Sequence, residues 1–137
     1  VATDFHNEHM PVVHKAANIA KTYGAKLHIV SVVPNVPYYM ASGLASLSDV
    51  EDSLESGSKD RLDEVKKSLD CEIESHIAQG SAKVEISRIA KDIKADLVVV
   101  GSHGRHGFQR VLGSTASGVL HRAKCDVLVV RVDFESE

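Results

Sequence analysis

The sequence predicts an α/β fold with an open, parallel, five-stranded sheet and helices on both faces. Apolar runs alternate with amphipathic stretches along the chain, in the order β-α-β-α-β-α-β-α-β. The apolar runs are continuous rather than alternating, which is typical of strands buried on both sides. The length of 137 residues suits one compact unit, so we expect a single domain over residues 1–137.

The first strand and helix are predicted from the opening of the chain. A short apolar run ends at Asp4, and because it begins at Val1 without a methionine we expect the natural start of this strand to be missing. Residues 7–24 then keep apolar side chains at helical spacing, and Gly24 is a typical helix end. The expected buried face consists of Val13, Ala16, Ala17 and Ala20.

A second strand is predicted over residues 26–33, which are rich in β-branched side chains and stop at Pro34. Residues 34–47 show no steady period and are expected to form a loop.

A long helix is predicted over residues 49–69. Ser48 followed by Glu51 fits a capping box at its start, and Gly57 marks a place where the helix bends or splits. The apolar positions at roughly helical spacing are Leu54, Leu62, Val65 and Leu69.

The second half of the chain predicts three more strands and two more helices. One helix is expected to bury Ile86, Ile89, Ala90 and Ile93. The predicted elements are a strand over 71–77, a helix over 82–95, a strand over 96–100, a helix over 114–123 and a strand over 126–132.

Three segments that are distant in sequence are expected to meet at one edge of this sheet. Asp4, Val32 and Gly101 each lie at the end of a predicted strand. In open parallel sheets, ligands bind outside the carboxyl ends of the strands. The sequence therefore predicts a ligand crevice between these positions.

A glycine-rich stretch follows the fourth predicted strand. The run "VVVGSHGRHGFQRVLGSTASGVLH" holds five of the nine glycines. Glycines allow close approach to main-chain N–H groups, and a helix start with Ser114 after Gly113 suits a phosphate. The alternative is that the glycines only turn the chain and Ser114 only caps the helix.

Two common phosphate motifs do not match this stretch. A Walker loop needs lysine between its last glycine and the Ser or Thr, whereas Gly113 is followed directly by Ser114. A dinucleotide fingerprint needs closer glycines beside the first strand.

The pattern "GSHG...GST" resembles the universal stress protein family. Its ATP-binding members carry glycine, two residues, glycine, nine residues, then glycine with Ser or Thr; here the longer spacer, Arg105 to Leu112, has eight residues. The likeness covers nearly the whole chain, since "VATDF", "KADLVVVGSHGRHG" and "AKCDVLVVR" are similar to the family's first strand end, fourth strand with its loop, and last strand. The resemblance implies a Rossmann-like fold of the adenine nucleotide α-hydrolase-like kind.

The resemblance also implies an ATP site, with Mg²⁺ carried by the phosphates. Asp4 would accept a hydrogen bond from adenine or ribose, and Val32 would offer its main chain to the adenine edge. From the residues alone, Asp4 as a helix cap, Val32 as plain core and Arg105 as a solvated charge remain alternatives. The implied nucleotide-binding residues are Ala2, Thr3, Asp4, Val32, Gly101, Ser102, His103, Gly104, Arg105, Gly107, Gly113, Ser114 and Thr115.

The expected function is that of a cytoplasmic, ATP-binding regulatory module of the stress response. The last strand is apolar and lies at the expected sheet edge, so pairing with its copy in a homodimer would cover it, and family members are commonly such dimers. The alternatives are a dimeric scaffold of the same fold without nucleotide and an adenine-nucleotide enzyme of the broader superfamily.

Several other function classes receive no support. The formal net charge is -3 and no apolar run is long enough to span a bilayer, so we expect neither a nucleic-acid nor a membrane partner. No GxSxG or HExxH motif is present, and Arg105 is the only cation near the proposed phosphates in sequence. ATP hydrolysis is therefore expected to be slow at most.

Histidines and cysteines are not expected to form a metal site. His103 and His106 lie on a glycine-rich loop that does not fix two imidazoles on one side, so no protein-bound transition metal is predicted. Surface positions are expected for His6, His9 and His14, and buried, reduced thiols for Cys71 and Cys125.

Overall fold

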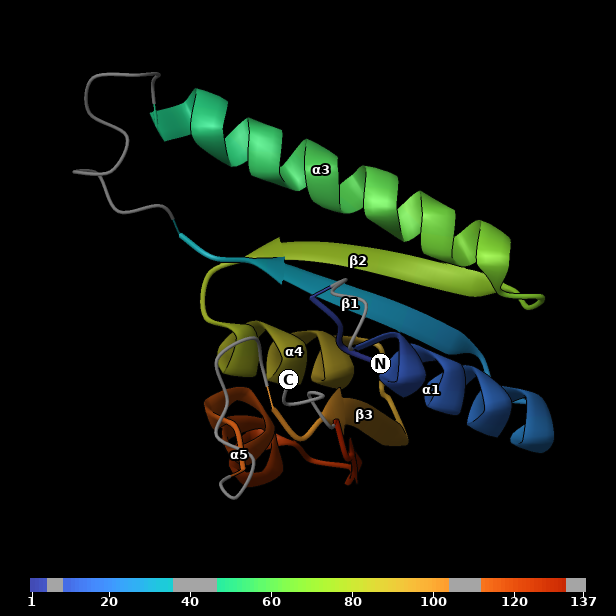
Figure 1. The fold of residues 1–137 in the computed structure, drawn as a ribbon. Coiled ribbons are helices and arrows are strands. Elements are labelled where there is room, and N and C mark those ends of the chain that lie inside the picture. The colour runs from blue at the N-terminus through green and yellow to red at the C-terminus, as the bar shows by residue number, and fades with distance from the viewer. Residues whose placement is uncertain (5–8, 36–46, 104–111, 133–137) are drawn as a thin grey trace, which may run out of the picture.

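Helices and strands alternate along the chain, as the sequence predicts (Figure 1). The computed structural model describes residues 1–4, 9–35, 47–103 and 112–132. The elements are α1 (Met10–Tyr23), β1 (Leu27–Val33), α3 (Leu47–Ser68), β2 (Ile73–Gln79), α4 (Ala82–Asp92), β3 (Leu97–Gly101), α5 (Ser114–Arg122) and β4 (Asp126–Val130).

The strands form two small parallel sheets, and the prediction of one five-stranded sheet is wrong for the described residues. β1 pairs with β2, and β3 pairs with β4. In place of the predicted first strand, Ala2 forms an isolated parallel bridge with Val30. The physical reason is that the hydrogen bonds of residues 1–3 are divided between β1 and β3, so no longer ladder forms with either strand.

The opening segment, residues 1–4, nevertheless joins the two sheets through its main chain. The Ala2 N–H donates to the carbonyl oxygen of Val99 in β3 at 3.0 Å, and the Thr3 N–H donates to that of Val30 in β1 at 3.0 Å. The Val30 N–H in turn donates to the carbonyl oxygen of Val1 at 2.8 Å. The opening segment therefore lies between β1 and β3.

Helices cover both faces of the strands. Figure 1 shows α3 and α4 on opposite sides of the β1–β2 pair. On the α1 and α3 side, Val13 and Leu62 pack against Ile29 of β1. On the α4 and α5 side, Ile86 and Val119 pack in a cluster with strand valines. Those strand residues are Val30, Val98 and Val100.

The helix ends and faces largely follow the predictions. Gly24 ends α1 with a left-handed φ of 63°, which glycine adopts without strain. α1 buries Val12 together with the predicted Val13, Ala16 and Ala20, and α4 buries Ile86, Ile89 and Ala90.

α3 differs from its prediction in three ways. It begins at Leu47, before the predicted cap Ser48, and it continues through Gly57 without a break. Leu62 and Val65 are buried as expected, but Leu54 is 41% exposed. The buried apolar side chains of α3 among the described residues thus lie in its second half.

β4 lies at an edge, because among the described residues it pairs only with β3. The Ser102 N–H donates to the carbonyl oxygen of Val130 at 2.8 Å. Since the N–H and C=O of one residue point to the same side in a parallel strand, the main chain of Val130 faces β3 and that of Val129 faces outward.

Two expectations about buried residues are wrong. Cys71 is exposed and Cys125 is half-buried, and both are free thiols. His9 is buried, whereas His14 is exposed as expected. His6 and His106 lie outside the described residues.

Candidate functional site

A pocket of about 110 Å³ lies at the carboxyl ends of β1 and β3. Its walls come from the opening segment, the ends of both strands, and the first turns of α4 and α5. This is the edge at which the sequence predicts a ligand crevice. The lining residues are Ala2, Thr3, Asp4, His9, Val30, Val32, Ala82, Ile86, Val100, Gly101, His103, Gly113, Thr115 and Ala116.

The pocket brings together many of the predicted nucleotide-binding residues. Ser102 and Ser114 are not among the lining residues. Gly104, Arg105 and Gly107 lie outside the described part of the chain. The predicted residues that do line the pocket are Ala2, Thr3, Asp4, Val32, Gly101, His103, Gly113 and Thr115.

Ser102 does not line the pocket, but it forms hydrogen bonds with two segments next to the pocket. Its hydroxyl oxygen accepts a hydrogen bond from the Val132 N–H at 2.9 Å, and its carbonyl oxygen accepts one from the Gly113 N–H at 2.7 Å. The end of β3 is thereby tied both to the chain after β4 and to the start of α5.

The two described glycines of the pocket differ in their packing and backbone conformation. A Cβ added to Gly101 would lie 3.1 Å from Val132 Cγ2 and 3.4 Å from Val12 Cγ2, so tight packing accounts for this position. Gly113 has φ -59° and ψ 154°, a conformation open to any residue. The backbone conformation therefore does not require glycine at this position, which lines the pocket.

The start of α5 turns its positive end toward the pocket. Gly113 is its N-cap residue and supplies no side-chain cap, and the first turn of the helix has no acidic residue. The alternative that Ser114 caps this helix is therefore not what the structure shows. The N–H groups of a first helical turn and the helix dipole favour an anion at this position.

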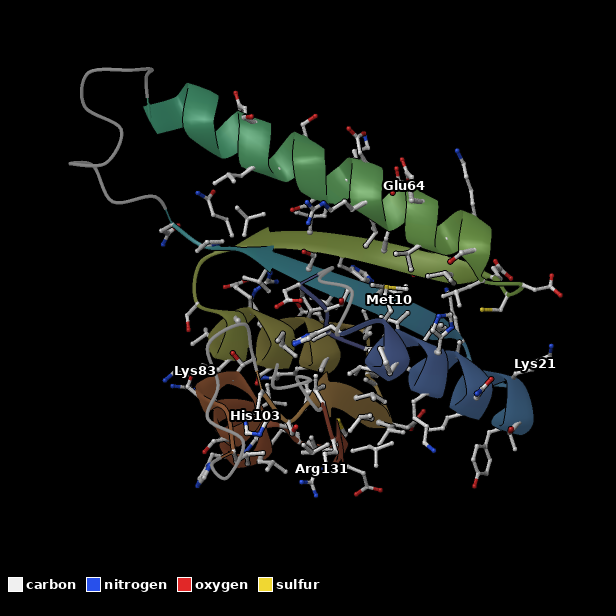
Figure 2. The ribbon with its side chains drawn as sticks, in the orientation of Figure 1. Met10, Lys21, Glu64, Lys83, His103 and Arg131 are labelled. Atoms are coloured by element: carbon white, nitrogen blue, oxygen red, sulfur yellow. The ribbon has the colours of Figure 1, made fainter. Side chains whose placement is uncertain are left out.

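Two buried histidines also face the pocket. His9 and His103 are 7% and 6% exposed, and both are lining residues. His9 Nδ1 lies 3.2 Å from Asp4 Oδ1. Figure 2 shows His103 close to α5. In the described part of the chain, His9 Nε2 and His103 Nδ1 have no hydrogen-bond partner.

Within the described ranges, these two ring nitrogens lack the polar partner that a buried nitrogen normally has. A buried polar group without a hydrogen bond costs about 1–3 kcal/mol, so structures seldom keep one without a use. Sequence reasoning assigned His103 to the site but missed His9, because nothing in the local pattern distinguishes it from a surface histidine.

A larger pocket of about 330 Å³ lies at the other ends of β1 and β3. Most of its lining is apolar and comes from α1, α4 and the strands, and it contains Ala2 but none of the other predicted residues. The smaller pocket is therefore the better candidate for a nucleotide.

Among the described residues, no lysine or arginine lines the smaller pocket. The helix end and the two histidines are thus the groups there that can face an anion.

A search of the helices within the described ranges finds none long and apolar enough to cross a membrane.

Comparisons with known proteins agree on one family. The sequence model of the universal stress protein family matches residues 1–131. Universal stress protein A homolog 2 from Coxiella burnetii is 42% identical over 128 residues, which cover 92% of this chain and 88% of that protein.

Solved structures show the same fold. The universal stress protein UspA from Lactobacillus plantarum superposes with a TM-score of 0.83 at 28% identity, covering 96% of this chain and 94% of the other. A universal stress protein crystallised in complex with cAMP has a TM-score of 0.67 at 28% identity, covering 97% of this chain and 95% of the other.

Proposed function

Because the chain belongs to the universal stress protein family, we propose that it binds an adenine nucleotide, ATP, in the smaller pocket. The observation that carries this proposal is the pair of buried histidines that line the pocket, His9 and His103, whose Nε2 and Nδ1 respectively have no hydrogen-bond partner among the described residues. The complex of a related protein with cAMP gives independent support for a nucleotide of this class.

The two ends of the nucleotide would meet different parts of the pocket. Thr3, Asp4 and Val32 lie on the side of the opening segment and β1, where hydrogen-bonding groups next to apolar surface suit adenosine. Asp4 lies within 3.2 Å of His9, so the histidine helps to orient the carboxylate.

The phosphates would lie at the start of α5. Gly113 and Thr115 line the pocket there, and the uncapped N–H groups of the helix favour negative charge. Mg²⁺ would come with the phosphates and be held largely by phosphate oxygens and water.

The proposed role is that of a cytoplasmic, single-domain regulatory module that pairs through β4 and responds to nucleotide. Turnover of ATP would be slow at most. Fast hydrolysis needs cationic charge on the transferred phosphoryl group, and the described lining offers no lysine or arginine.

Calorimetric titration with ATP and Mg²⁺ tests the site. Gly113→Val should abolish binding, because the φ and ψ of Gly113 accept valine and a bulkier residue at this lining position would narrow the proposed phosphate end. Gly57→Val is the matched control, since Gly57 lies in α3 with no heavy atom within 4 Å of an added Cβ. This control should bind ATP like the unchanged protein.

The result decides between the proposal and its alternatives. No heat and no thermal shift at millimolar ATP, AMP and cAMP would favour the scaffold without nucleotide. Binding that survives Gly113→Val would place the phosphates elsewhere. Turnover comparable to that of ordinary ATPases would contradict the regulatory assignment.

A further inference from the structure

A second polar cluster lies on β1 and β2, away from the pocket at the carboxyl ends. It consists of His28, Glu74 and His76. His28 is the register partner of Glu74 in the parallel pairing, and His76 lies two residues further along β2. Because side chains alternate along a strand, Glu74 and His76 point to the same face of the sheet. This is the face covered by α4, where Val30 also packs.

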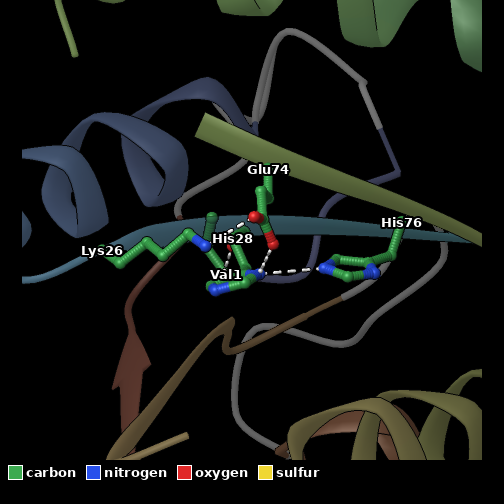
Figure 3. Close-up of polar contacts among 5 residues, drawn as sticks. All are labelled: Val1, Lys26, His28, Glu74 and His76. Atoms are coloured by element: carbon green, nitrogen blue, oxygen red, sulfur yellow. Dashed lines mark hydrogen bonds and ion pairs between the residues drawn. The ribbon is translucent and has the colours of Figure 1, made fainter. Parts of the chain in front are cut away.

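The three side chains converge on one point. His28 Nδ1 lies 2.9 Å from His76 Nε2 and 3.4 Å from Glu74 Oε2. The two imidazole rings stack with centroids 5.2 Å apart at an angle of 23°. Figure 3 shows Glu74 and His76 reaching toward the His28 ring from β2.

We propose that His28, Glu74 and His76 bind a divalent transition-metal ion, with zinc as the best fit. Two imidazole nitrogens and one carboxylate oxygen are a donor set that zinc uses, with the fourth position left to water. Metal bonds of about 2.0–2.2 Å in a tetrahedron place neighbouring ligand atoms about 3.3–3.6 Å apart. The 3.4 Å separation between His28 Nδ1 and Glu74 Oε2 falls in this range, and the 2.9 Å separation between His28 Nδ1 and His76 Nε2 is shorter, so these two rings would move apart slightly around an ion.

The two shifts of pKa in the cluster both favour the deprotonated side chains, the forms that bind metals. Burial lowers the pKa of His28 below its ordinary value. A hydrogen bond from Lys26 lowers the pKa of Glu74. Lys26 contacts Oε1 of Glu74, and Oε2 is the atom that faces His28.

The cluster is accessible to an ion from solvent. The side chain of Glu74 is 51% exposed, whereas that of His28 is 17% exposed. Lys26 and His28 also line the larger pocket at the amino ends of β1 and β3, which provides room for a bound water. This metal site is thus separate from the nucleotide pocket and does not depend on it.

Nucleotide-free protein titrated with Zn²⁺ in a calorimeter tests the proposal, and Co²⁺ provides a second readout through the visible absorption of a tetrahedral complex. One ion should bind per chain. His76→Ala and Glu74→Gln should each weaken binding at least about tenfold, because each removes one of three protein ligands. His14→Ala is the matched control, since His14 is an exposed histidine on α1, and it should bind like the unchanged protein.

Thermal unfolding without metal separates lost binding from lost fold. Glu74→Gln replaces one oxygen of a half-exposed side chain and should leave the melting temperature of the metal-free protein nearly unchanged. If His76→Ala proves unstable, the affinity of Glu74→Gln for Zn²⁺ is the deciding measurement. Absence of Zn²⁺ and Co²⁺ binding to the unchanged protein would overturn the proposal. So would equal affinity in Glu74→Gln and the unchanged protein, because the ion would then be held elsewhere.

Discussion

His103 has a buried ring nitrogen, Nδ1, without a partner among the described residues. A buried polar atom without a hydrogen bond lowers the stability of a folded protein. If the proposed nucleotide supplies that hydrogen bond, the stability lost in the free protein is recovered in the complex.

Replacing this histidine should therefore separate the two properties. We expect His103→Leu to unfold at the same or higher denaturant concentration, because an apolar side chain replaces an unpaired polar group. The same change should weaken ATP binding about tenfold, which corresponds to one hydrogen bond of roughly 1.4 kcal/mol.

Equilibrium denaturation and calorimetry measure the two effects. His121→Leu serves as the control because His121 is exposed near the end of α5. Unchanged ATP affinity in His103→Leu would show that the histidine serves packing alone.

Single residues also show where sequence reasoning succeeds and where it stops. Asp4, Val32 and Gly101 were predicted to meet because parallel strands end at one edge, and they line one pocket. His9 was missed because its burial depends on how the opening segment meets α1. His28 lies far in sequence from Glu74, so their proximity depends on strand register that no local pattern reveals.

Among the elements, the two helical glycines outside the pocket have opposite surroundings. Gly57 lies in the exposed half of α3 with no heavy atom within 4 Å of an added Cβ. Gly118 lies in α5 against α4, where an added Cβ would be 2.6 Å from Lys83 Cβ. The close approach of these two helices thus depends on the missing side chain.

The same substitution at the two positions should have opposite effects on the free energy of unfolding. Gly57→Ala should stabilise the protein by about 0.5–1 kcal/mol through helix propensity. Gly118→Ala should destabilise it by about 1–3 kcal/mol, because Lys83 Cβ is fixed to the backbone of α4 and the helices must move apart. Urea denaturation measures both changes, and stabilisation by Gly118→Ala would refute the tight packing of α4 on α5.

The helices and strands were largely predictable because their signals are local. Apolar periodicity and the glycine after α1 are contained in a few consecutive residues. The sheet was not predictable to the same degree. Whether residues 1–3 form a ladder or a single bridge depends on how many partners β1 and β3 offer them, which is a property of the assembled fold.

For the molecule as a whole, the exposed edge of β4 suggests how two copies would associate. The N–H of Val129 points away from β3 and has no strand partner in the described part of the chain, so it could pair with a second strand. We expect the protein to sediment with twice the 14.8 kDa mass of the chain.

A proline at this position tests the pairing. Val129→Pro should give monomers, because proline removes an outward N–H without removing a hydrogen bond between β3 and β4. Val129→Ala shortens the side chain but keeps the N–H, so it should remain a dimer. Analytical ultracentrifugation distinguishes the two, and a dimeric Val129→Pro variant would mean that another surface holds the copies together.

The hydrogen bonds of the opening segment make local opening and ligand binding one equilibrium. The amide protons of Ala2 and Thr3 exchange with solvent only when their bonds to Val99 and Val30 break. The same two residues line the pocket, so a ligand that needs the closed arrangement must slow their exchange by the factor that its binding adds. The exchange rates of these two amide protons thus measure how often the opening segment, which bridges the two sheets, detaches from β3 and β1.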